Sequence, residues 1–144
     1  MRKQKGFTLI EIVVVLLLIS TILGLSVPSL TDSWHQVQLD FAIQQLHRDI
    51  RWAQREAVKN QCRMQITFYS ADRKYVIRRP GQPLNLRKRE LKTKLDTMTA
   101  SSIIIEKDKR IYRNGHVMLT KGGHERYVYI YQTGRTRVTK APAQ

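Results

Sequence analysis

An uninterrupted apolar run near the N-terminus constrains this chain more than any other feature. Between Ile12 and Leu30 there are 19 residues without a charge, and 13 of them are Ile, Leu or Val. On an insertion scale these 13 side chains favour a bilayer by about 4 to 8 kcal/mol. The run is also long enough to cross the hydrocarbon core as a helix. The sequence therefore predicts a single-pass membrane helix, and the basic residues Arg2, Lys3 and Lys5 ahead of it predict a cytoplasmic N-terminus.

A single acid, Glu11, stands at the start of this run. A secretory signal peptide would have a shorter apolar core followed by a small-residue cleavage site. A plain membrane anchor fits the length, but an unpaired carboxylate costs about 2.5 to 3.5 kcal/mol near the centre of a membrane helix. Cleavage after Gly6 would free an ammonium group on Phe7, four residues before Glu11. The ammonium of a neighbouring copy could then pair with the Glu11 carboxylate.

The segment KGFTLIE resembles the class III leader and mature start of type IV pilins and pseudopilins. This resemblance implies cleavage between Gly6 and Phe7 by a prepilin peptidase, N-methylation of Phe7, and use of Glu11 to set the register between subunits. Pro28 also matches a family position at which the helix is loosened. Because its ring presses on the carbonyl of Gly24, a kink or local melting is expected there. An ordinary anchor with a tolerated membrane proline is the alternative.

Beyond the proline the apolar residues recur with helical spacing, which predicts an amphipathic helix. The predicted buried stripe consists of Leu39, Ile43, Leu46, Ile50, Ala53 and Ala57. Trp34, Val37 and Phe41 are expected to widen this stripe near its start, and Asn60 is expected to end the helix in a left-handed conformation.

After Asn60 the apolar residues alternate with polar ones, which predicts short strands joined by tight turns. The expected strands are Cys62 to Phe68, Lys74 to Arg79, Ile103 to Ile105, Arg110 to Arg113, His116 to Thr120, Arg126 to Gln132 and Arg135 to Thr139. Turns are expected at 70–73 and 121–124, and Asn114-Gly115 predicts a hairpin between the strands on either side. The segment Leu84 to Leu95 is either an edge strand or an irregular basic excursion. The predicted fold class is α+β, with one long N-terminal helix packed on a small antiparallel sheet.

The domain organisation follows from these elements. Residues 1–6 are expected to be a removed leader, 7–30 a transmembrane and assembly helix, 31–61 its amphipathic continuation, 62–140 the sheet domain and 141–144 a loose tail.

Two further stretches narrow the resemblance to a subfamily. AQREAVKNQCRMQITF and YVYIYQTGRTRV are similar to the helix-to-strand junction and terminal strand of H-type pseudopilins. Together with the basic composition they resemble a minor pseudopilin of the Gram-positive competence system, which builds a DNA-uptake pilus. The resemblance implies a cell-membrane protein that reaches the cell surface when assembled. Its implied partners are other major and minor pseudopilins, the prepilin peptidase and methylase, the assembly platform with its ATPase, and membrane lipid.

The same sequence features are compatible with two other functions. The same architecture would serve a type II secretion pseudopilus or the tip of a type IV pilus. Alternatively, the basic domain would be a membrane-anchored DNA receptor in its own right.

The charge is strongly basic and unevenly distributed. The net charge is +15, and removal of a leader with three basic residues leaves +12. Between Arg73 and Lys94 there are nine basic residues and one acid, Glu90. Such a patch would attract DNA, anionic wall polymers or an anionic membrane surface through charge alone. The expected polyanion contacts are Arg78, Arg79, Arg87, Lys88, Arg89, Lys92 and Lys94, and Tyr127, Tyr129 and Tyr131 share one strand face that could stack bases.

The sequence offers no catalytic or metal-binding pattern. His35, His47, His116 and His124 have no metal-ligand spacing with one another or with Cys62, the single cysteine. No nucleophile elbow or phosphate-cradling glycine loop is present. We therefore expect a substrate of processing enzymes rather than an enzyme, with no cofactor, and with Cys62 as a buried structural thiol.

Overall fold

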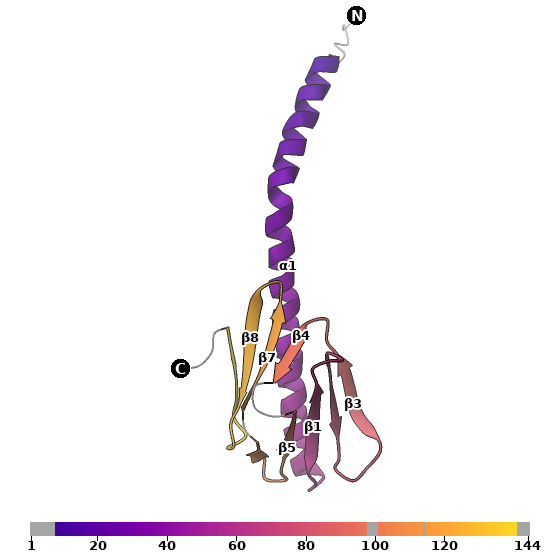
Figure 1. Cartoon of the computed structure of the whole chain (residues 1–144), viewed down its shortest axis with the longest axis vertical. Coiled ribbons are helices and arrows are strands. Elements are labelled where there is room, and N and C mark those ends of the chain that lie inside the picture. The colour runs from indigo at the N-terminus through magenta and orange to yellow at the C-terminus, as the bar shows by residue number, and fades with distance from the viewer. Residues whose placement is uncertain (1–7, 98–100, 114, 141–144) are drawn as a thin grey trace, which may run out of the picture. The chain divides into compact units, whose positions relative to one another are not determined.

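The computed structural model describes residues 8–97, 101–113 and 115–140. Within them the chain forms one long helix, α1 (Leu9–Lys59), followed by nine strands (Figure 1). Contacts divide the chain into two compact units, Met1–Trp34 and His35–Gln144. The strands all belong to the second unit: β1 (Met64–Tyr69), β2 (Lys74–Arg78), β3 (Asn85–Glu90), β4 (Lys94–Thr97), β5 (Ser102–Ile105), β6 (Ile111–Tyr112), β7 (Gly115–Lys121), β8 (His124–Ile130) and β9 (Thr136–Thr139).

The first unit contains the apolar start of α1. Its large apolar side chains between Leu9 and Leu23 are 46 to 82% exposed. The hydroxyl groups of Ser20 and Thr21 donate back to backbone carbonyls one turn earlier, at 2.7 and 2.9 Å. These two polar side chains are therefore satisfied by the helix itself, as an apolar environment would require.

The backbone of α1 is helical without interruption from Gly24 to Pro28. A local melting at this point is not seen, and the predicted kink stays a prediction. Within the described residues, no helical stretch combines the length and the hydropathy needed to cross a membrane.

In the second unit the predicted stripe on α1 is confirmed as the centre of the core. Leu39, Ile43, Leu46, Ile50, Ala53 and Ala57 are all 0 or 1% exposed and pack with buried residues of both sheets. The prediction that Trp34, Val37 and Phe41 widen this stripe is wrong, because they are 62, 58 and 64% exposed. Phe41 is two residues from Leu39, which is about 200° of rotation around a helix. These three side chains therefore lie on the opposite face.

The C-terminus of α1 is closed by a pair of backbone hydrogen bonds. The N–H of Cys62 donates to the carbonyl of Ala57 at 3.1 Å, and the N–H of Gln61 donates to the carbonyl of Val58 at 3.3 Å. This is the Schellman pattern, and its left-handed residue is Gln61 with φ of 49°. The prediction that Asn60 takes this conformation is therefore wrong by one residue. Cys62 is half-buried and packs against the core.

The strands form two antiparallel sheets rather than the single sheet that was expected. Sheet A has the order β3-β2-β1-β5-β6, and sheet B has the order β4-β7-β8-β9. Both lie along the second half of α1 (Figure 1) and contribute to one hydrophobic core. The α+β class with a long N-terminal helix is confirmed. Two sheets arise because β4 pairs with β7, so the chain crosses between sheets instead of adding each strand to its predecessor.

The predicted hairpin at Asn114-Gly115 is wrong. The strand before it, β6, pairs with β5, whereas the strand after it, β7, pairs with β4 and β8. Ile111 of β6 is only 2% exposed, so the core holds this strand in sheet A. Tertiary packing thus outweighs the local turn preference of Asn-Gly. The turn at 121–124 is confirmed as the β7–β8 hairpin, with Gly122 and Gly123 at φ of 57° and 80°.

The ambiguous segment Leu84 to Leu95 contributes edge strands to both sheets. Its first part is β3, which ends sheet A, and its last residues enter β4, which ends sheet B. Leu91 and Leu95 are 8 and 1% exposed. Their side chains pack into the core and hold the connection between β3 and β4 against it.

A buried carboxylate, Asp49, ties β3 and β2 to α1. The Tyr75 hydroxyl donates to Asp49 Oδ2 at 2.8 Å, and Arg87 Nη1 donates to Asp49 Oδ1 at 2.6 Å. Arg89 Nε lies 3.5 Å from Oδ2. Burial and the neighbouring carboxylate raise the pKa of Tyr75 above its ordinary value, so the phenol remains a donor. The guanidinium of Arg87 also stacks 3.9 Å above the ring of Trp52.

We expect Asp49→Ala to lower the free energy of unfolding by about 1 to 3 kcal/mol, because the buried Tyr75 hydroxyl would lose its acceptor. Urea unfolding of the full chain in a neutral detergent measures this. Glu90→Ala, which removes the exposed 3.3 Å pair with Lys88 and a charge interaction with Lys74, is the control and should cost less than about 1 kcal/mol. Equal losses in the two variants would contradict the structural role of Asp49.

Candidate functional site

The predicted processing residues Gly6 and Phe7 lie outside the described residues. Glu11 is described and is the third residue of α1 after the cap. Its backbone N–H donates to Thr8 Oγ1 at 3.3 Å, which makes Thr8 the N-cap. The Thr8-x-x-Glu11 spacing is that of a capping box, a local signal that the sequence reading missed. The Glu11 side chain is exposed, so its carboxylate is accessible from the helix surface.

The structure divides the predicted basic patch between the two faces of β3 in sheet A and the start of β4 in sheet B. Arg87 and Arg89 lie opposite Ile77 and Tyr75 and share their face, which is turned to α1. Both are engaged by Asp49, whereas Lys88 lies on the other face. Of the seven predicted contacts, Lys88, Arg89, Lys92 and Lys94 are exposed, and Arg78, Arg79 and Arg87 are half-buried. Polyanion contacts by this patch stay a prediction, with the charge of Arg87 and Arg89 partly offset by Asp49.

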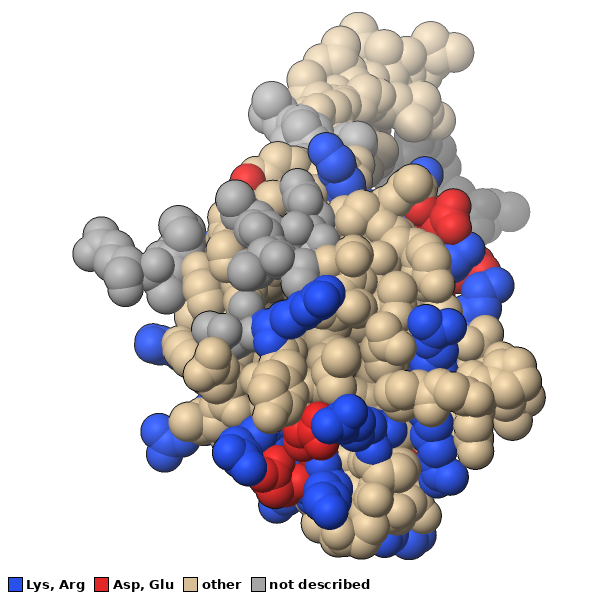
Figure 2. Space-filling view, turned by 60° about the horizontal axis from the view of Figure 1, so that its bottom comes forward, with Lys and Arg blue, Asp and Glu red and all other residues tan. Residues whose placement is uncertain are grey.

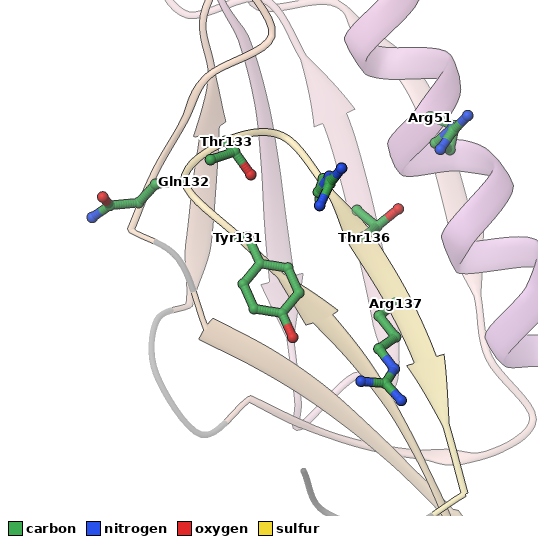
Figure 3. Close-up of a pocket in the computed structure, with 7 residues that line it drawn as sticks. Arg51, Tyr131, Gln132, Thr133, Thr136 and Arg137 are labelled. Atoms are coloured by element: carbon green, nitrogen blue, oxygen red, sulfur yellow. The ribbon is translucent and has the colours of Figure 1, made fainter. Parts of the chain in front are cut away.

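A second basic cluster, which the sequence reading did not single out, surrounds the loop between β8 and β9. Arg51 of α1 and Arg135 and Arg137 of the loop and β9 line a hollow of about 790 Å³ (Figure 3). The remaining lining residues are Tyr131, Gln132, Thr133 and Thr136, so no acid lines the hollow. The three arginines are exposed, and none of them forms an ion pair within the described part of the chain.

Gly134 determines the backbone conformation of the β8–β9 loop. This residue has φ of 80°, and a Cβ placed on it would lie 2.4 Å from the backbone oxygen of Lys109. Its N–H donates to the carbonyl of Tyr131 at 2.9 Å, and its own carbonyl accepts from Gln54 Nε2 at 2.6 Å. Only glycine fits this conformation and this close approach. The loop is therefore fixed between α1 and the β5–β6 connection.

His47 holds the start of β9 against α1. Its Nε2 lies 2.8 Å from Thr136 Oγ1, one residue away from both Arg135 and Arg137. Burial and, secondarily, the charge of Arg51 lower the pKa of His47 below its ordinary value of 6.5. The imidazole is therefore neutral in the fold at neutral pH.

Neighbouring hollows extend this cluster across the polar face of α1. One of about 370 Å³ is lined by Arg51, Arg55, Lys109 and Arg135 among others, so it shares Arg51 and Arg135 with the first. Another of about 380 Å³ is lined by Arg55 and by Arg48, Arg87 and Arg89 beside Phe41 and Trp52, so it shares Arg55 with the second. We call the three together the basic groove. The three hollows lie beside β9, α1 and β3, and their lining contains one acid, Asp49, which is 4% exposed.

Figure 2 shows Lys and Arg side chains spread over one end of the second unit, with acidic side chains in a few small groups. Part of the groove could have been found in the sequence. Arg48, Arg51 and Arg55 recur at helical spacing on one face of α1, and Thr-Gly-Arg-Thr-Arg at 133–137 places two arginines beside a turn glycine. The sequence could not show that these two stretches lie side by side. Among the described residues, no group of three or more His, Cys, Asp or Glu side chains could hold a metal ion.

The architecture, a long N-terminal helix whose second half packs on antiparallel sheets, is the fold of type IV minor pilins and pseudopilins. The type IV minor pilin FimU of Pseudomonas aeruginosa superposes with a TM-score of 0.62 at 16% identity, over 72% of this chain and 90% of that chain. A second crystal form of FimU gives a TM-score of 0.60 at 17% identity, over 70% of this chain and 92% of that chain.

The minor pseudopilin EpsH from the type 2 secretion system of Vibrio cholerae has the same fold. Its TM-score is 0.59 at 10% identity, over 72% of this chain and 97% of that chain. Residues 1–27 match the family model of the prokaryotic N-terminal methylation motif. A comparison with curated protein sequences finds no significant match. The chain thus combines a methylation motif at its start with the minor pilin fold.

The lowered pKa of His47 predicts a pH dependence of stability. Because the unfolded state binds a proton more readily than the fold, stability should be full above about pH 6.5 and should decrease as the pH falls below it. Urea unfolding of the full chain between about pH 7 and about pH 5 measures this slope. His47→Gln should flatten it, whereas His124→Gln, in the β7–β8 hairpin, controls for the loss of an imidazole. An unchanged slope in His47→Gln would contradict the assignment.

Proposed function

We propose that this chain is a minor pilin-like subunit of a pilus that brings extracellular DNA to the uptake machinery of the cell membrane. In this proposal it is cut after Gly6 and N-methylated at Phe7, and its apolar helix anchors it in the membrane before assembly. The methylation motif over residues 1–27 and the minor pilin fold support the subunit role. The exposed apolar side chains between Leu9 and Leu23 would pack against the helices of neighbouring subunits.

The basic groove is the observation that carries the DNA part of the proposal. Exposed guanidinium groups without acidic neighbours attract phosphates, and binding to a phosphate polymer releases its counterions. Neighbouring hollows share lining arginines: Arg51 and Arg135 line the first and second, and Arg55 lines the second and third. Cations spread over three neighbouring hollows fit a polymer better than they fit a small anion.

A pseudopilin of a type II secretion system is the second candidate. It is favoured by the likeness to EpsH, 97% of which is covered by this chain. Deletion of the gene separates the two functions, because loss of transformation with intact protein secretion supports the first and the reverse result supports the second. Anionic wall polymers are the alternative ligand of the groove.

The groove predicts salt-dependent binding of duplex DNA by the full chain in a neutral detergent. Replacement of Arg51, Arg135 and Arg137 by Gln should reduce the slope of log K against log salt by about 2 to 3, because each phosphate contact contributes about 0.9. Fluorescence anisotropy with labelled DNA at several salt concentrations measures the slope.

The matched control replaces three exposed basic residues outside both the groove and the predicted patch, Lys59, Lys107 and Lys140, by Gln. This variant loses the same charge and should keep most of the slope. If both triple variants lose the same amount, binding depends on net charge alone and the groove has no special role.

Assembly should depend on the charge of Glu11. In the proposed mechanism its carboxylate neutralises the Phe7 ammonium of an adjacent subunit. Glu11→Ala should leave cleavage and membrane insertion intact while pilus assembly is lost, as measured by shearing and immunoblotting of surface pili. A normally assembled pilus in this variant would refute the mechanism.

Two further variants separate the charge of Glu11 from its place in the capping box. Glu11→Gln keeps a residue suited to the third helical position but removes the charge, so it should also fail to assemble. Thr8→Ala removes the N-cap oxygen and keeps the charge, so it should assemble. The opposite pattern would assign the effect to helix capping.

A further inference from the structure

Three tyrosines form a row, two on the outer face of β8 and one directly after its end, and they differ in exposure. Tyr127 is 6% exposed and its hydroxyl donates to Glu125 Oε2 at 2.5 Å. Tyr129 is half-buried, and Tyr131 is 41% exposed. The suggestion that all three tyrosines could stack bases therefore does not hold for Tyr127, which is covered. Tyr131 is the ring of this row that solvent reaches most.

The buried members of the row hold Tyr129 in a fixed orientation. Tyr127 and Tyr129 are stacked with 6.2 Å between ring centroids and 22° between ring planes. The ring of His116, on the neighbouring strand β7, lies 5.1 Å from Tyr129 and 5.8 Å from Tyr127. Tyr129 is thus already in contact with two rings, which leaves Tyr131 as the ring of this group that a base can reach most easily.

Two arginines lie next to the tyrosines along the chain fold: Arg137 on the adjacent strand β9 and Arg135 in the loop before it. Arg137 lies directly opposite Tyr129 in the β8–β9 register, so the two side chains share a sheet face. The N–H of Tyr131 donates to the carbonyl of Arg135 at 3.0 Å, and both residues line the same hollow as Arg137. In Figure 3 the Tyr131 ring and the Arg137 side chain point in the same direction from their strands, whereas Gln132 points away.

This alternation of aromatic rings and guanidinium groups suits a nucleotide unit. A base offers a π-face that stacks on tyrosine, and its phosphate is recognised by arginine. A simple polyanion would use the arginines and leave the rings without a role. We propose that Tyr131 stacks an unpaired base while Arg135 and Arg137 bind the adjacent phosphates, so that this end of the groove favours single-stranded over duplex nucleic acid.

The preference for unpaired bases follows from geometry. In a duplex each base face is covered by its neighbours in the stack, so an exposed ring at a sheet edge reaches only terminal or unpaired bases. The second hollow, which is lined by Arg51, Arg55 and Lys109 without an aromatic ring, would bind both forms. The inference rests on the proposed DNA binding and adds the strand preference of one end of the same groove.

The test compares three probes of equal length and label on the full chain in a neutral detergent. They are oligothymidylate, an abasic single strand with the same phosphates, and a duplex of the same length. We expect oligothymidylate to bind roughly tenfold more tightly than the abasic strand, since stacking on one aromatic ring contributes about that factor. Tyr131→Ala should remove this difference, and Tyr131→Phe, which keeps the ring, should retain it.

Tyr69→Ala is the matched control, because Tyr69 is 40% exposed but lies on β1 of sheet A. It should leave the binding of all three probes unchanged. Equal binding of oligothymidylate and the abasic strand by the unaltered chain, or an equal loss for both in Tyr131→Ala, would overturn the stacking proposal while the DNA-binding groove stands. No binding of any probe at low salt would overturn the proposed DNA binding itself.

Discussion

The packing of one helical stripe against two sheets is the constraint on which the rest of this structure depends. Leu39, Leu46, Ile50 and Ala57 are completely buried, and residues from both sheets meet them in one core. A small domain with a basic surface has few other sources of stability. The alanines at the end of the stripe allow the strands to approach the helix closely, and the Schellman closure after Lys59 turns the chain directly into the first strand.

The same helix also positions the candidate site, because its two faces carry different chemistry. When the apolar stripe is buried, helical geometry turns Arg48, Arg51 and Arg55 outwards. The sheets then bring their own arginines to both sides of this polar face: Arg87 and Arg89 from β3, Arg135 from the β8–β9 loop and Arg137 from β9. The charged residues that line the groove are all cations except Asp49, so they repel one another, and a polyanionic ligand would relieve that repulsion.

The β3 end and the β9 end of the groove differ in how far their arginines are neutralised, and Asp49 is the reason. It is 4% exposed and accepts from Tyr75 and Arg87, so the β3 end of the groove is braced by an internal ion pair. At the β9 end the loop is held instead by neutral contacts, those of Gln54 with Gly134 and of His47 with Thr136. The arginines at that end therefore keep their charge uncompensated, which makes it the better candidate for phosphate contacts.

The sequence by itself determined the helix, its buried stripe, the α+β class and the methylation motif, because each depends on periodicity or on contiguous residues. It also located most strands. Only the tertiary structure decided that the strands form two sheets, that Asn114-Gly115 joins strands of different sheets, and that Trp34, Val37 and Phe41 lie outside the core. Only the tertiary structure brought Arg51 beside Arg135 and Arg137. Such pairings depend on which distant segments compete for the same core surface, and local patterns along a chain carry no information on that competition.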